Sequence, residues 1–283
     1  MTFNTVALKF AYYCKINTEN ESPTLLDIGA QTPTFKIEKF KKYISNISKF
    51  NPEQDDAIQK ISSGKKFLAK DAYIALGYQE YEVIDINGAY NSYKFDLNQD
   101  IDANYNFKNQ YDVVINNGTG EHVFNQFSLY KNIHNLTKKD GLMLNILPFL
   151  GWTNHGFYNY HPIFFADLAA SNNYELVRMT FANRDGQEIC LQDMNDHAIL
   201  YEQVKPHKPP NNLSKLISAS IENLGKNIFL VTVYRKRSTS DFKIPLQGKY
   251  LEDVQDFDTE YNDQKEGSSK ADGQVSDNNK RKN

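Results

Sequence analysis

Short apolar runs alternate along the chain with amphipathic stretches, which predicts strands and helices in alternation. Apolar runs bounded by turn residues indicate buried strands. The predicted strands are 24–29, 81–85, a shorter one at 93–97, 111–116, 141–147, 174–181 and a closing strand at 227–234.

The helical periodicity is clearest between residues 35 and 50, where apolar positions recur on one helical face. These positions are Ile37, Phe40, Ile44 and Ile47. Asn51-Pro52 is predicted to end this helix. Further helices are predicted at about 66–76 with Gly77 as its C′ residue, from the turn at 117–120 to about Leu136, at 162–170 and at 213–224.

This alternation predicts an α/β fold, with a mostly parallel sheet that carries helices on both faces. Residues 1–252 would form one domain. From residue 253 onward the chain loses its apolar periodicity and becomes polar, so 253–283 are predicted to be a disordered tail.

Composition narrows the function. The chain has 283 residues and a net charge of -3, and this balance argues against a nucleic-acid partner. It has only two cysteines, Cys14 and Cys190, which we interpret as reduced buried thiols. No apolar run approaches the ~18–20 residues that span a bilayer. We therefore expect a cytoplasmic protein with no membrane partner.

Polar residues follow the predicted strands, where ligands bind in open α/β sheets. The first strand leads into Asp27-Ile28-Gly29-Ala30-Gln31, and the next ends at Asp85. Asn116-Asn117-Gly118-Thr119-Gly120-Glu121-His122 follows a later strand. An aromatic loop that contains His155 follows the strand after that.

In this order and spacing, residues 24–250 resemble the class I S-adenosylmethionine-dependent methyltransferases, in particular small bacterial methyltransferase-like proteins. The motifs are 26–31, 83–86, 96–98, 111–125, 155–162 and 242–247. The resemblance implies a Rossmann-like, doubly wound sheet of seven strands whose last pair includes an antiparallel strand. It also implies S-adenosylmethionine as the cofactor.

The resemblance carries cofactor roles onto particular positions. The family's glycine-rich loop falls on Asp27, Gly29, Ala30 and Gln31, its ribose acid on Asp85 with Ile86 next to it, and the residues near the adenine on Asp96 and Leu97. Asn116 and Gly118 would complete the cofactor site. Only the first glycine of the loop is kept, because Gln31 and Pro33 occupy the other two positions. The long spacing from Gly29 to Asp85 implies a helical insertion at about 36–64.

Methyl transfer to a hydroxyl or amine also requires a base for the acceptor's proton. The candidates are His122, Glu121 and His155, and histidine is favoured because its pKa lies near neutrality. A plainer interpretation is that Glu121 complements a helix dipole. No metal is predicted, because His155 and His161 lack other ligands at metal spacing.

The sequence thus predicts a methyltransferase that acts on a small-molecule or sugar-containing acceptor. Two alternatives stay open. One is a protein of methyltransferase fold that serves in binding or assembly without transferase activity, as the lost glycines suggest. The other is a nicotinamide-dependent oxidoreductase, which lacks support because the chain has no phosphate-binding glycine loop. The oligomeric state is not predicted.

Overall fold

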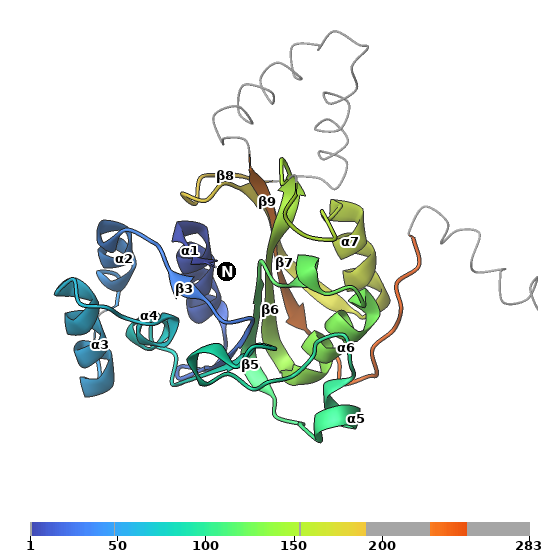
Figure 1. Ribbon diagram of the computed structural model, residues 1–283, viewed down its shortest axis with the longest axis horizontal. Coiled ribbons are helices and arrows are strands. Elements are labelled where there is room, and N and C mark those ends of the chain that lie inside the picture. The colour runs from blue at the N-terminus through green and yellow to red at the C-terminus, as the bar shows by residue number, and fades with distance from the viewer. Residues whose placement is uncertain (1, 48, 153, 191–226, 248–283) are drawn as a thin grey trace, which may run out of the picture.

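The computed structural model describes residues 2–47, 49–152, 154–190 and 227–247 (Figure 1). The helices are α1 Thr5–Asn17, α2 Ile37–Ile44, α3 Pro52–Ser62, α4 Ala69–Ala75, α5 Ile101–Tyr105, α6 Gln126–Leu136 and α7 Pro162–Ser171, with short 3-10 turns η1 Ala89–Asn91 and η2 Gly120–His122. The strands are β1 Thr2–Phe3, β2 Thr24–Ile28, β3 Thr32–Pro33, β4 Glu80–Ile84, β5 Tyr111–Asn117, β6 Thr137–Leu150, β7 Tyr174–Ala182, β8 Glu188–Cys190 and β9 Ile228–Lys236.

Seven strands form the central sheet in the order β4-β2-β5-β6-β9-β7-β8. The pairs β4–β2, β2–β5 and β5–β6 are parallel. The late strand β9 inserts antiparallel between β6 and β7, and β8 pairs antiparallel with β7. The fold class is therefore confirmed: a Rossmann-like, mostly parallel sheet with antiparallel pairing at its far side.

Helices cover both faces of the sheet (Figure 1). Neighbouring residues in a strand point to opposite faces, so Leu25 packs in the core beneath α1 to α4, and Leu26 packs in the core beneath α6 and α7. Strands buried on both sides explain why the sequence shows continuous apolar runs rather than alternation.

The helix α1 was not predicted. Its residues Val6, Leu8, Phe10 and Cys14 are buried, together with Thr5, Ala7 and Ala11. A helix that is buried around much of its circumference lacks the apolar stripe that marks an amphipathic helix. Its start is capped by Asn4, whose side chain accepts a hydrogen bond from the backbone of Ala7.

Asn51-Pro52 was predicted to end the first helix, but in the structure it begins the next one. The first predicted helix already ends at Ile44, and Asn51 instead caps the new helix α3, with Pro52 in its first turn. A reciprocal pair of hydrogen bonds with Gln54 forms a capping box at this start. Residues 36–64, the predicted insertion, thus contain α2 and α3.

The predicted strand at 93–97 is wrong. Only Tyr93 makes an isolated parallel bridge, to Ile84. The segment packs through its rings instead: Phe95 stacks on Tyr105 with centroids 4.3 Å apart and lies edge-on to Phe107 at 5.3 Å. Aromatic residues favour strands, but these rings fill a side cluster rather than extending the sheet.

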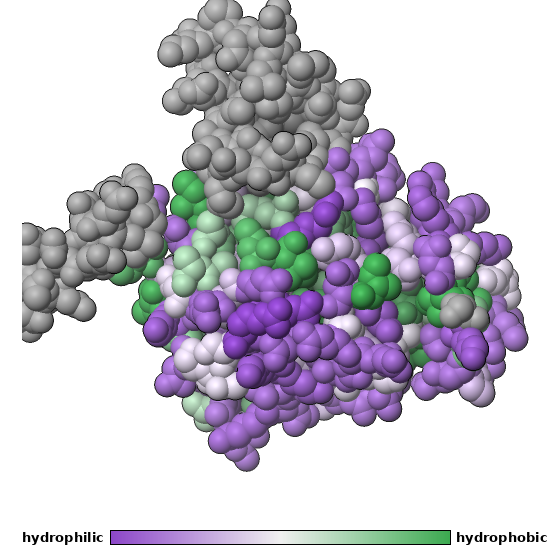
Figure 2. All heavy atoms as spheres, turned by 180° about the vertical axis from the view of Figure 1, so that it is seen from behind, coloured by the Kyte–Doolittle hydropathy of each residue, from purple (hydrophilic) through white to green (hydrophobic). Residues whose placement is uncertain are grey.

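The helix predicted at 213–224, the tail at 253–283 and the boundary at 252 lie outside the described residues. Figure 2 shows that the face of the molecule turned away in Figure 1 is mainly hydrophilic, with smaller hydrophobic patches. None of the helices in the described ranges is long and apolar enough to cross a membrane.

Candidate active site

The loops that follow β2, β4 and β5 meet at the carboxyl edge of the sheet and are bonded to one another. The backbone N–H of Gly29 donates to the carbonyl of Ile84 at 2.8 Å. The next N–H, of Ala30, donates to Oδ2 of Asp85, also at 2.8 Å. Residues 29–31, here named the glycine loop, are therefore held directly beside the predicted ribose acid.

Gly29 is required where it stands. Its φ is +97°, which side chains rarely adopt, and a Cβ placed on it would lie 2.0 Å from Oγ1 of Thr119. The Thr119 hydroxyl in turn donates to the carbonyl of Ile28. The glycine therefore lets the loop after β5 pack directly on the loop after β2.

Gln31, which replaces a family glycine, fills the space next to this contact. Its side chain is buried, and its Nε2 donates to the carbonyls of Gly29 and Asn117 at 3.2 and 2.9 Å. Its Oε1 accepts a hydrogen bond from Nδ2 of Asn117 at 3.1 Å. The protein itself thus occupies both N–H donors of the amide and one acceptor position of its oxygen.

Asp85 and Ile86 remain accessible at the end of β4. Each oxygen of Asp85 accepts one backbone hydrogen bond, Oδ2 from Ala30 and Oδ1 from Asn87. A carboxylate has about four acceptor positions, so capacity is left for hydroxyl groups. Ile86 is 70% exposed and offers an apolar surface beside the acid.

Asp27, by contrast, is enclosed. It is fully buried, and its Oδ2 lies 3.4 Å from the hydroxyls of both Tyr73 and Tyr81. Burial raises the pKa of the Asp27 carboxyl well above its ordinary value. The structure places this predicted cofactor residue beneath the glycine loop rather than at its surface.

The remaining predicted cofactor residues divide into two groups. Asn116 is buried, donates to Asn145 and accepts from the backbone N–H of Gly120, so it shapes the turn after β5. Gly118, with φ of +67°, lies in that turn. Asp96 accepts from Asn98, and Leu97 is buried; this loop contacts the start of α6 through Asn98 and Asn125.

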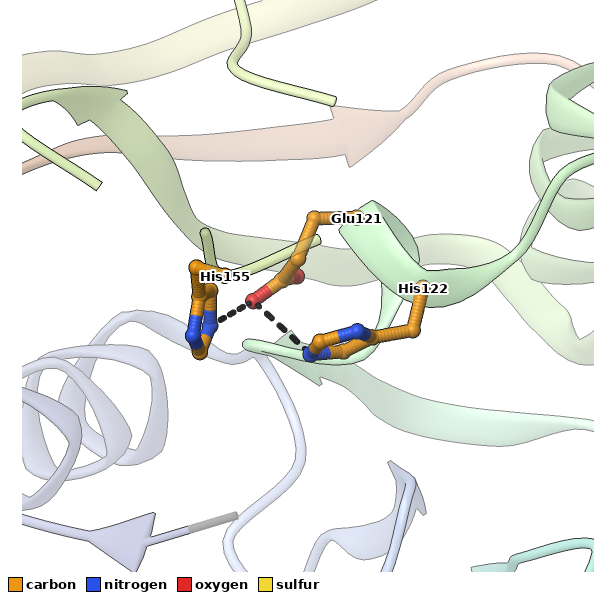
Figure 3. Close-up of side chains that lie close together, drawn as sticks. All are labelled: Glu121, His122 and His155. Atoms are coloured by element: carbon orange, nitrogen blue, oxygen red, sulfur yellow. Dashed lines mark hydrogen bonds and ion pairs between the residues drawn. The ribbon is translucent and has the colours of Figure 1, made fainter. Parts of the chain in front are cut away.

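The three predicted catalytic residues come together, although they lie in two different loops (Figure 3). Oε1 of Glu121 lies 3.1 Å from Nε2 of His155 and 3.8 Å from Nε2 of His122. The two imidazole rings contact each other edge to face at 4.9 Å. We name Glu121, His122 and His155 the His–Glu cluster.

Close backbone packing holds the two loops in this arrangement. The N–H of Phe157 donates to the carbonyl of Glu121 at 2.7 Å. Gly156 lies so close that a Cβ on it would come within 2.8 Å of both Cγ and the carbonyl oxygen of Glu121. The ring of Trp152 packs on His155 at 4.9 Å. Glycine at 156 is therefore the local reason that His155 reaches Glu121.

The members of the cluster differ in exposure. The Glu121 side chain is fully buried, whereas the side chains of His122 and His155 are 41% and 37% exposed. Burial raises the pKa of Glu121 to about 7 and lowers the pKa of both histidines. The arrangement presents neutral imidazoles at the surface with a carboxyl group behind them.

Two exposed aromatic residues each follow a histidine of the cluster by two positions in the chain. Phe124 and Phe157 are 71% and 68% exposed and lie edge to face at 5.8 Å. The hydroxyl of Tyr158 donates to the carbonyl of Phe124 at 2.9 Å. The aromatic loop after β6 thus contributes both an exposed surface, through Phe157, and core, through the buried Tyr160.

The pairing of Glu121 with His155 was not predicted. His155 and His161 were considered together as metal ligands and rejected, and in the structure the imidazole of His161 accepts a hydrogen bond from the backbone of Ile163 and caps α7. Proline directly after His161 is a helix-start signal that points to this capping role. The approach of Glu121 to His155, across 34 residues, leaves no local signal.

Neither a family model nor a curated protein matches this chain. Solved structures that match it include an S-adenosylmethionine-dependent methyltransferase from Archaeoglobus fulgidus, with a TM-score of 0.40 and 14% identity over 81% of this chain and 94% of that one. An O-methyltransferase from a polyketide synthase multienzyme of Brevibacillus brevis, in complex with S-adenosyl-L-homocysteine, matches with a TM-score of 0.37 and 12% identity. The match covers 84% of this chain and 74% of that one. Coclaurine N-methyltransferase, bound to N-methylheliamine and S-adenosyl-L-homocysteine, matches with a TM-score of 0.36 and 14% identity. The match covers 81% of this chain and 71% of that one.

Proposed function

We propose that this protein is an S-adenosylmethionine-dependent methyltransferase that acts on a hydroxyl or amine group of a small-molecule or sugar-containing acceptor. The observation that carries the proposal is the position of the His–Glu cluster. It lies on loops after β5 and β6, and Thr119, two residues before Glu121, packs on Gly29 of the glycine loop. This position, next to the edge where open α/β sheets bind ligands, supports a role of the cluster as proton acceptor.

The residues at the end of β4 suit the adenosine part of the cofactor. Asp85 retains acceptor capacity for the two ribose hydroxyls, and the exposed Ile86 suits packing against a base. The methionine end fits less well, because Gln31 and Thr119 occupy the space around Gly29.

The chemistry asks little of the protein beyond positioning and proton removal. The cofactor supplies a methyl group on a sulfonium, and the protein aligns the acceptor and excludes water. A neutral imidazole of His122 or His155 takes the acceptor's proton, and the carboxylate of Glu121 stabilises the imidazolium that forms. Phe124 and Phe157 border the acceptor's approach with apolar surface.

Calorimetric titration with S-adenosylmethionine and with S-adenosylhomocysteine tests the proposal. We expect binding of both, and Asp85→Asn should weaken it roughly tenfold or more, because hydrogen bonds to a charged carboxylate are lost. Asp102→Asn is the matched control, since Asp102 is an exposed acid on α5 that pairs with Lys108. No binding of either ligand at millimolar concentration would refute the proposal.

The filled glycine loop favours a second candidate, a binding or assembly protein of methyltransferase fold without transferase activity. The buried amide of Gln31 makes three hydrogen bonds within the protein, and none of these needs a ligand. Gln31→Ala separates the two functions. If the Gln31 side chain blocks the glycine loop, we expect the wild type to bind no S-adenosylmethionine and the Gln31→Ala variant to bind it. If the protein is a transferase, we expect the wild type to bind S-adenosylmethionine as well.

A further inference from the structure

We propose that the His–Glu cluster is a binding site for a divalent transition-metal ion, with Zn²⁺ as the probe. Glu121 would supply one carboxylate oxygen, and His122 and His155 one imidazole nitrogen each. The inference concerns the cluster of the proposed function but does not depend on methyl transfer.

The geometry is close to that of a three-ligand site. The three ligand atoms lie within 4.8 Å of one another. Zinc bonds to nitrogen and oxygen are about 2.0–2.2 Å long, so ligand atoms around one ion lie roughly 3–4 Å apart. Two of the separations, 3.1 Å to His155 and 3.8 Å to His122, are already in this range. The third separation, between the imidazole nitrogens of His122 and His155, is at most 4.8 Å, and a small rotation of the exposed His122 ring would bring it into this range.

The Glu121 carboxyl provides an independent indication. It is fully buried, and its second oxygen, Oε2, has no hydrogen-bond partner within the described part of the chain. Buried carboxyl oxygens are normally hydrogen-bonded, paired with a charge or bound to a metal. Oε1 is the oxygen that faces the two imidazoles, so a cation held there would compensate the buried charge of the carboxylate, while Oε2 would stay outside the ligand set.

The donor set indicates which ions fit. Two imidazoles and one carboxylate suit zinc, iron, cobalt or nickel, whereas magnesium and calcium prefer oxygen ligands alone. The exposure of both histidines gives an ion a route from solvent. Three protein ligands also leave at least one coordination position open, as in catalytic rather than structural zinc sites.

Metal binding would change how the cluster removes a proton. Both imidazoles would be ligands and no longer bases. An acceptor hydroxyl in the open position would lose its proton to solvent, because the ion lowers the pKa of an oxygen bound to it. The exposed Phe124 and Phe157 would then border the open position.

The test is calorimetry of the full, tag-free chain with Zn²⁺, together with visible absorption after addition of Co²⁺. We expect one ion per chain and a cobalt spectrum typical of nitrogen and oxygen ligands. His155→Ala, His122→Ala and Glu121→Gln should each weaken binding by more than the roughly 10–100-fold typical of losing an outer-shell partner. Glu121→Gln keeps the shape of the side chain, so a loss there is not a folding effect.

His161→Asn is the control, because asparagine preserves the helix cap that His161 makes and removes an imidazole close to the cluster in sequence. It should bind Zn²⁺ like the wild type. Absence of binding in the wild type would overturn the inference. Equal affinity in the wild type and all three cluster variants would overturn it too, since the ion would then lie elsewhere.

Titration of the same variants with S-adenosylhomocysteine keeps the two proposals apart. Binding of Zn²⁺ without binding of this ligand would refute the transferase and leave the metal site standing. The reverse result would leave the transferase with imidazole as its base.

Discussion

Two carboxyl groups, those of Asp27 and Glu121, lie fully buried near the ends of adjacent strands, and each has one oxygen without a hydrogen-bond partner in the described residues. Asp27 is on β2, and Glu121 follows β5. Their surroundings differ. Asp27 faces the hydroxyls of two tyrosines, Tyr73 and Tyr81, whereas Glu121 faces two half-exposed imidazoles.

This difference supports the roles we propose, a structural one for Asp27 and a functional one for Glu121. Burial raises the pKa of both carboxyls, so a raised pKa alone does not identify the site. The tyrosines offer Asp27 neutral donors and no access for a ligand. The imidazoles give Glu121 partners that can take a proton or a metal and that reach solvent. Access, rather than burial, points to chemistry at Glu121.

The largest expected effect concerns the glycines beside the two acids. Gly29→Ala should lower the free energy of unfolding by about 3 kcal/mol or more, because it combines a positive φ with a clash against Thr119. Gly156→Ala should cost less, about 1–3 kcal/mol, because its clash with Glu121 is not accompanied by a positive φ. Urea unfolding of both variants measures the difference. A larger cost for Gly156→Ala would show that the His155 loop, not the glycine loop, is the tighter junction.

The second effect distinguishes the two acids directly. Zn²⁺ at 100 times its Kd should raise the free energy of unfolding by about 2.7 kcal/mol. The increase should persist in Asp27→Asn and disappear in Glu121→Gln. Thermal unfolding with and without Zn²⁺, and after a chelator, measures it. Loss of the increase in Asp27→Asn would show that the two acids are coupled.

The third effect is a pH dependence at Asp27. Its pKa is raised by burial above the ordinary 3.8, so the folded state holds this proton more tightly than the unfolded state. Its contribution to stability is therefore full below the unfolded pKa and is lost as pH rises through the folded pKa. Asp27→Asn, which cannot ionise, should gain stability relative to the wild type as pH rises. Urea unfolding from mildly acidic to mildly alkaline pH measures this; a constant difference would mean that Asp27 does not titrate in this range.

The smallest effect concerns access to Glu121. Phe124→Ser should change the free energy of unfolding by no more than about 0.5 kcal/mol, because the ring is 71% exposed. Affinity for Zn²⁺ should also stay the same, since Phe124 is not a ligand. A large loss of stability would show that this ring belongs to the core, as Tyr73 does beside Asp27.

Much of the fold could be predicted from the sequence because parallel strands buried on both faces leave continuous apolar runs. The strands β2, β4, β5, β7 and β9 lie at or within two residues of the predicted ranges, and β6 is longer than predicted. The helix α1 was missed because its burial on many sides erases the amphipathic stripe. The segment 93–97 was misassigned because aromatic residues favour both strands and side clusters.

The sequence by itself determined the strands, the loops at their ends and the residue types able to take a proton, since these depend on local periodicity and side-chain chemistry. Only the tertiary structure decided that Glu121, His122 and His155 meet and that Gln31 closes the glycine loop. Each of these depends on contacts between residues far apart in the chain or on a hydrogen-bond partner outside the local pattern. The backbone approach of Gly156 to Glu121 follows from how two loops pack at the edge of the sheet, and no periodicity encodes it.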